Sequence, residues 1–69
     1  MHLQFADETE ALEYAEIHAR RDEYPFCYDR TNAQDMEHFK EIEQESTRMR
    51  AFNADVHGKS YLIGTYALE

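Results

Sequence analysis

Residues 60–68 have the sequence SYLIGTYAL and are apolar on both faces of an extended chain. Strands that meet water on one side alternate apolar and polar residues, whereas strands covered on both sides are apolar throughout. This stretch therefore predicts either a central β-strand or a strand whose second face meets a partner. Both alternatives make a sheet the centre of the fold. The remaining segments are expected either to extend this sheet as strands or to cover it as helices.

Two further strands are expected nearer the N-terminus. Residues 2–6 alternate in polarity, with Leu3 and Phe5 on the same side. Residues 24–29 (YPFCYD) are short and aromatic, and Pro25 stands near their start, where a missing N–H does least harm to a sheet. A fourth short strand follows if residues 56–60 form a hairpin with Gly58-Lys59 as a type II′ corner.

Two amphipathic helices are predicted between these strands. Asp7, with a glutamate three residues later, forms a capping pattern for a helix that begins at Glu8 and ends near Asp22, before the proline. A Thr-x-x-Gln pattern at residues 31–34 precedes a longer helical period, which predicts a helix over residues 33–51. Each segment has one apolar and one charged face.

The predicted fold is therefore α+β, in the order β-α-β-α-β. A small sheet of three to four strands is expected to carry both amphipathic helices on one face. With 69 residues the chain suffices for one domain, residues 1–69. A domain of this length buries only roughly 60% of the surface that its unfolded chain exposes, so a second copy or a partner would help to stabilise it.

The sequence does not predict catalysis, a cofactor or a metal site. Cys27 is the single cysteine and stands among aromatic and acidic residues, which favours a packed thiol over a nucleophile. The four histidines are scattered without the spacing of zinc ligands. Two glycines, at positions 58 and 64, cannot build a phosphate-binding loop.

Charge is the most informative property of the chain. Fifteen acidic and seven basic residues give a net charge of −8, the wrong sign for direct binding to nucleic acid. Arg20 and Arg48 are expected to pair within their helices with Glu16 and Glu45. Like charges four residues apart, about 6 Å along a helix, destabilise it, so acidic rows suggest a binding role. Two such rows are predicted to contact a partner: Glu37, Glu41 and Glu45, and Glu10, Glu13 and Glu16.

Tyrosine is the second unusual feature of the composition. Five tyrosines and no tryptophan occur in a chain too short to bury every ring with a satisfied hydroxyl. Surface tyrosines beside carboxylates suit a protein-binding patch, because the ring supplies contact area at low entropic cost. The candidate anchors are Tyr14, Tyr28, Tyr61 and Tyr66.

These features predict a non-catalytic protein that binds the basic nucleic-acid-binding site of a host protein complex. In size, acidity and lack of catalytic motifs the chain resembles the small inhibitors of phages and mobile elements, including anti-CRISPR proteins and DNA mimics. This resemblance implies an inhibitor or modulator in the cytoplasm of a host cell; no run of about 20 apolar residues suggests a membrane span. The alternative is a small regulatory or structural homodimer formed through the C-terminal strand.

Overall fold

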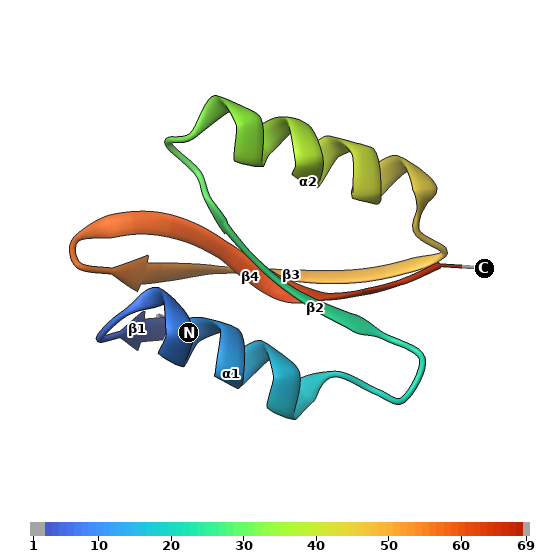
Figure 1. Ribbon diagram of the computed structural model, residues 1–69, viewed down its shortest axis with the longest axis horizontal. Coiled ribbons are helices and arrows are strands. Elements are labelled where there is room, and N and C mark those ends of the chain that lie inside the picture. Colours follow the sequence, from blue (N-terminus) through green and yellow to red (C-terminus); the bar gives the residue numbers. More distant parts are fainter. Residues whose placement is uncertain (1–2, 69) are drawn as a thin grey trace.

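The computed structural model describes residues 3–68, which form two helices and one sheet of four strands (Figure 1). The elements are, in chain order, β1 (Leu3–Phe5), α1 (Glu8–His18), β2 (Tyr24–Asp29), α2 (Ala33–Glu45), β3 (Arg48–Val56) and β4 (Lys59–Ala67). The sheet order is β1-β3-β4-β2; β1 runs parallel to β3, and the other two pairs are antiparallel. The predicted α+β class is confirmed.

The apolar C-terminal stretch forms β4 and is a central strand. It pairs with β3 on one side and with β2 on the other, and Ile63 at its middle is fully buried. Its apolar character on both faces is thus explained within the monomer. Because both of its edges are already paired, this strand offers none for the homodimer considered as an alternative.

A tight hairpin joins β3 to β4, and it confirms the predicted fourth strand. The register pairs Val56 with Lys59, so the two-residue loop consists of His57 and Gly58. Both loop residues have positive φ, 53° and 78°, as a type I′ turn requires. The predicted corner, Gly58-Lys59, is therefore wrong by one residue.

Both helices end earlier than predicted. α1 ends at His18. Beyond it, the backbone N–H of Arg20 donates to Oε1 of Glu23 (2.8 Å) and the N–H of Glu23 donates to the carbonyl of Arg20 (2.9 Å), which forms a turn at residues 21 and 22. α2 ends at Glu45, and residues 48–51 of the predicted helix instead pair with β4. The cap of α2 is Asn32, whose side chain accepts from the N–H of Asp35 (3.0 Å).

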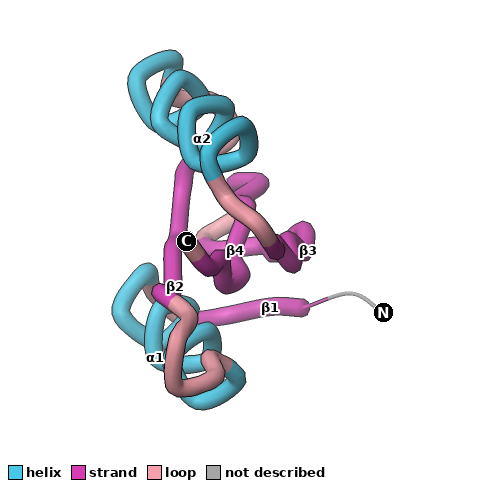
Figure 2. The backbone as a smooth tube through the Cα atoms, turned by 90° about the vertical axis from the view of Figure 1, so that its right-hand side faces the viewer, coloured by secondary structure: helices cyan, strands magenta, loops and turns pink. Residues whose placement is uncertain are grey.

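The two helices lie on opposite faces of the sheet, so the prediction that they share one face is wrong (Figures 1 and 2). The reason lies in β2, which is apolar on both sides. Cys27 packs against the core cluster beneath α1. The neighbouring Phe26, which points the other way, contacts Phe39 of α2, with ring centroids 5.9 Å apart. Each helix therefore has its own apolar surface to cover.

The main core lies between the sheet and α1. Ala11 of α1 is fully buried in a cluster with Ala54, Val56, Tyr61 and Ile63. Alanine side chains let the helix approach the strands closely. α2, in contrast, has no fully buried residue. It covers aromatic side chains of β2 and is held less tightly than α1. Within residues 3–68 neither helix is long and apolar enough to cross a membrane.

The outer edge of β2 has few backbone groups that are free to pair with another strand. The N–H of Arg30 donates to the carbonyl of Ser60 (3.1 Å), which leaves residues 25, 27 and 29 of β2 with their backbone groups pointing away from β4. Pro25 has no N–H, and the N–H of Asp29 donates to Oδ2 of Asp35 (3.0 Å). The free edge of β2 is thereby largely closed to a further strand.

Candidate protein-interaction surface

The outer side of α2 presents the acidic row predicted from the sequence. Glu37, Glu41 and Glu45 are all exposed, whereas Phe39 of the same helix faces the sheet and contacts Phe26. Asp35 and Glu43 add two more carboxylates to the same helix, and Lys40 is its one basic residue. We call these six charged residues of α2 the acidic surface; Asp35, at the start of the helix, is only partly exposed and also accepts from the N–H of Asp29 (3.0 Å).

The charge density of the acidic surface can be compared with that of nucleic acid. Five carboxylates and one lysine give α2 a net charge of −4 over 13 residues, about 20 Å of helix. This is one negative charge per about 5 Å, compared with about 3.4 Å for a single DNA strand and about 1.7 Å for the duplex. The helix therefore approaches the charge spacing of one strand and not that of a duplex.

Aromatic rings line the sheet beside α2. Tyr66 contacts Tyr24 (5.5 Å between centroids) and Phe26 (6.1 Å), and Phe26 stacks on Tyr28 (5.4 Å). Tyr28 also lies edge-on to His38 of α2. Tyr28 and Tyr66 are partly exposed, so two of the four candidate anchors are accessible next to the acidic surface.

Tyr28 is electrostatically linked to that surface. Burial is the main cause that raises the pKa of its phenol, followed by the nearby Tyr66 and the carboxylates of Asp35 and Glu41. The phenol therefore stays protonated well above neutral pH and remains a hydrogen-bond donor. A protonated tyrosine within the field of carboxylates suits a contact with a partner that supplies both cations and acceptors.

The other two candidate tyrosines belong to the α1 side. Tyr14 is half-buried and packs between Phe5 (5.3 Å between centroids) and His18 (4.5 Å). Tyr61 is only 6% exposed, and its hydroxyl donates to Oε1 of Glu8 (2.6 Å), which raises the pKa of the phenol. Tyr61 is therefore a core residue, and the expectation that it serves as a surface anchor is wrong.

The second acidic row lies on α1, away from the first. Glu10, Glu13 and Glu16 are exposed. Because α1 and α2 cover opposite faces of the sheet (Figure 2), the two rows do not form one surface. A partner that docks against the outer side of α2 does not reach the row on α1. The structure thus divides the six predicted glutamates into two separate sets of three.

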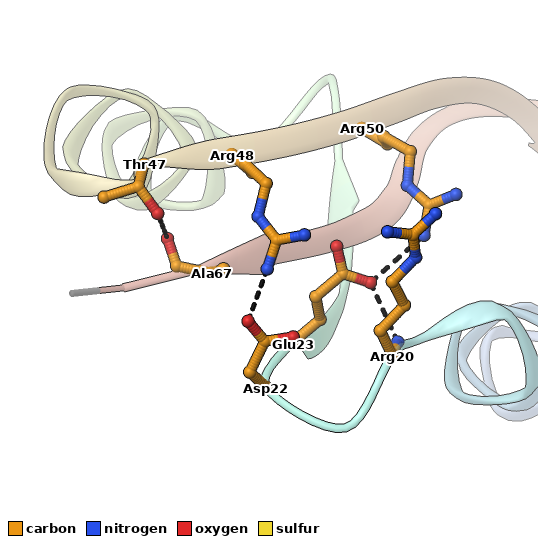
Figure 3. Close-up of polar contacts among 7 residues, drawn as sticks. All are labelled: Arg20, Asp22, Glu23, Thr47, Arg48, Arg50 and Ala67. Carbon is orange, nitrogen blue, oxygen red and sulfur yellow. Dashed lines mark hydrogen bonds and ion pairs between the residues drawn. The ribbon is translucent and has the colours of Figure 1, made fainter.

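The basic residues gather at one end of the sheet, which the sequence did not predict. Arg48 forms an ion pair with Asp22, and Arg50 donates to Oε1 of Glu23 (3.1 Å) and to the carbonyl of His18 (3.1 Å) (Figure 3). The expected pairing of Arg48 with Glu45 is therefore replaced by a contact across 26 residues. We call Arg20, Arg48 and Arg50 the arginine cluster.

Glu23 is the acid that organises this cluster. Its side chain is only 4% exposed although its neighbours remain largely accessible. The N–H of Arg20 is the main cause that lowers the pKa of the Glu23 carboxyl, and Arg50 lowers it further. The carboxylate thus stays charged and ties the loop that follows α1 to β3. Four arginines and two acids occur within residues 20–23 and 48–50, so this end of the molecule differs in sign from the acidic surface.

Cys27 is half-buried beneath α1, and burial raises the pKa of its thiol to about 11. Burial is the largest cause of this shift, and the nearby acids Glu8, Asp35 and Asp29 contribute to it. A thiol of this kind is almost wholly protonated at neutral pH and is a poor nucleophile. Among residues 3–68, no three histidine, cysteine, aspartate or glutamate side chains are grouped as metal ligands would be.

Comparison of the chain with protein-family models, with curated proteins and with solved structures found no match.

Proposed function

We propose that this protein is a non-catalytic inhibitor or modulator that binds the nucleic-acid-binding site of a host protein complex through its acidic surface. The observation that carries the proposal is the five carboxylates on a helix that buries none of its residues completely. A helix with this charge repels itself, and its packing against the sheet does not require the outward glutamates. Binding to a cationic groove would replace the repulsion among these carboxylates with attraction to the partner.

The arrangement of charge supports a groove built for a single strand. The acidic surface carries one net charge per about 5 Å of helix, which is closer to one strand than to a duplex. Tyr28 and Tyr66 lie beside it, where a partner's cationic or aromatic side chains could contact their rings. Carboxylates would steer the approach, and the tyrosines would supply the desolvated centre of the contact. Such a protein would act in the cytoplasm of the host cell and could come from a phage or mobile element.

A pair of matched charge reversals tests this proposal. The variant E37K/E41K changes the acidic surface, and E13K/E16K makes the same change in net charge on the other face of the sheet. Immobilised wild-type protein is used to capture partners from a host lysate, and a single-stranded oligonucleotide is used as the competitor. We expect the captured protein to be lost with E37K/E41K, retained with E13K/E16K and released by the oligonucleotide.

Salt dependence gives a second readout on the same captured protein. The screening length falls from about 10 Å at 0.1 M salt to about 3 Å at 1 M, so binding is expected to weaken steeply over this range. Circular dichroism shows whether both variants remain folded. Equal loss of binding in both variants would mean that only the overall negative charge matters, and binding that survives E37K/E41K would refute the role of α2.

A further inference from the structure

The outer edge of β3 is a second, independent feature that points to a ligand. β1 pairs only with Ala54–Val56, so residues 48–53 of β3 have no strand neighbour on that side within the described chain. The hairpin makes Val56 and Lys59 a hydrogen-bonded pair, and alternate residues 50, 52 and 54 therefore bond to β4. Met49 and Ala51 point their backbone groups outward. We call residues 48–53 the open edge.

A small apolar cavity lies beside the open edge. It has a volume of about 150 Å³ and lies between α1 and the sheet. Its lining includes Tyr14 and Ala15 of α1, Phe52 of β3, and Ile63 and Thr65 of β4. A cavity of this size accepts a benzene-sized group. Phe52 is 48% exposed although it lines the cavity, so apolar surface is accessible from the side of the open edge.

Thr65, which lines the cavity, carries an unsatisfied polar atom. Thr65 is only 2% exposed, and its Oγ1 atom has no hydrogen-bond partner among residues 3–68. Buried hydroxyl groups in folded proteins are nearly always paired, because an unpaired one loses its bonds to water without replacement. A hydroxyl-bearing aromatic group would fill the cavity and supply the missing partner. A tyrosine side chain has both properties.

The charge around the open edge indicates the charge that a ligand would carry. Arg48 and Arg50 project from it and Arg20 lies next to Arg50, so three guanidinium groups lie at this end of the sheet (Figure 3). A second copy pairing through this edge would bring the same arginines towards each other, which is unfavourable. Asp22 and Glu23 offset two of the four arginine charges in residues 20–23 and 48–50, and an acidic segment is complementary to the remaining net charge of +2.

We propose that the open edge of β3 binds an acidic peptide in extended conformation, which inserts one tyrosine side chain into the cavity. The peptide backbone would pair with Met49 and Ala51 as an added strand. Its tyrosine hydroxyl would contact Oγ1 of Thr65, and its carboxylates would lie near the arginine cluster. This surface is separate from α2 and does not depend on the proposed function.

Synthetic peptides test this proposal directly. The probe is the acetylated peptide EEVYVEE, and its matched controls are EEVFVEE, which lacks the hydroxyl, and KKVYVKK, which reverses the charge. Binding is measured by titration calorimetry and by amide chemical shifts in nuclear magnetic resonance spectra. We expect EEVYVEE to bind about tenfold more tightly than EEVFVEE, a difference of about 1.4 kcal/mol, and KKVYVKK not to bind. The shifts should concentrate at residues 48–53.

Two variants separate the parts of the proposed contact. Thr65→Val removes the hydroxyl and should abolish the preference for tyrosine over phenylalanine. Ala51→Pro removes an outward N–H that β4 does not use, and should block binding of both peptides. If Ala51→Pro does not fold, EEVYVEE with N-methylated alternate amides gives the same test on the wild-type protein and should not bind. The proposal is overturned if EEVYVEE fails to bind, if the shifts map to α2 or β2, or if backbone methylation leaves the affinity unchanged.

Discussion

Gly64 provides the sharpest test of the strand register on which every surface described above depends. A Cβ atom at this position would lie 1.8 Å from the carbonyl oxygen of Arg50 and 3.0 Å from the Cα atom of Ala51. The first contact must open to at least 3.0 Å, and both atoms that block it belong to the backbone. Gly64→Ala therefore forces β3 and β4 apart at the centre of the sheet.

The expected cost follows from the bonds on either side. Gly64 is opposite Ala51, and the neighbouring pairs formed by residues 50 and 65 and by residues 52 and 63 exchange up to four backbone hydrogen bonds. At about 1 kcal/mol each, their loss costs about 4 kcal/mol. A 69-residue domain is typically stable by about 3–10 kcal/mol. The variant should therefore lose about 40% of its stability at the upper end of this range and be unfolded at the lower end.

Gly58 offers a matched control. Gly58→Ala adds the same methyl group, but its destabilising effect comes from backbone strain and not from a steric clash. Gly58 has φ +78° and no atom within 4 Å of the added Cβ, so the substitution costs only the left-handed backbone strain, about 1–2 kcal/mol. Urea denaturation followed by circular dichroism should give a modest decrease in midpoint for Gly58→Ala and a far larger one for Gly64→Ala. An alanine at position 64 that leaves the midpoint unchanged or raises it, as it does at unhindered glycines, would show that the register of β3 against β4 is wrong.

Three further predictions concern buried side chains. Thr65→Val replaces an unpaired buried hydroxyl by a methyl group and should raise the free energy of unfolding by about 1–2 kcal/mol; a decrease in urea denaturation would show that the hydroxyl has a partner. Tyr61 has a raised pKa because it donates to Glu8, so its stabilising effect is complete below its ordinary pKa of 10.0 and is lost as the pH rises further. Tyr61→Phe should lower the free energy of unfolding by about 1 kcal/mol at pH 7. It should also make the free energy of unfolding fall less steeply between pH 9 and about 12. If urea denaturation gives the same pH dependence for both proteins in this range, the prediction is contradicted. Cys27, with a pKa of about 11, should react with a thiol reagent far more slowly than a free cysteine at pH 8, and fast labelling of the folded protein would show that the thiol is exposed.

The parts of the fold that depend on local sequence could be predicted. The aspartate cap placed the start of the first helix at Glu8, and the apolar stretch at residues 60–68 indicated a strand that is either central or covered by a partner, of which the structure shows the first. The end of the second helix could not be found in this way. Residues 46–51 continue the helical pattern, but pairing with β4, which is distant in the sequence at that end, determines their conformation. Local periodicity does not report such long-range pairing.

The positions of the candidate residues within each helix could be predicted from the sequence, but the arrangement of the two helices around the sheet could not. Helical spacing placed Glu37, Glu41 and Glu45 together on one exposed side of α2, as the structure has them. The face of the sheet covered by each helix depends on the alternation within β2, whose two sides are both apolar, so the separation of the two acidic rows could not be derived from either helix alone. The burial of Tyr61 likewise results from its position in the central strand opposite Ala54.

The unequal edges of the sheet have a consequence for assembly. Pro25 and the carboxylate of Asp35 close most of the β2 edge, whereas residues 48–53 of β3 have no strand neighbour on their outer side within residues 3–68. A molecule that can extend its sheet in both directions can stack repeatedly into a filament. A molecule with one usable border can join only a single additional chain, after which growth stops. Extension of this sheet through its edges is therefore limited to one added strand and cannot propagate into a filament.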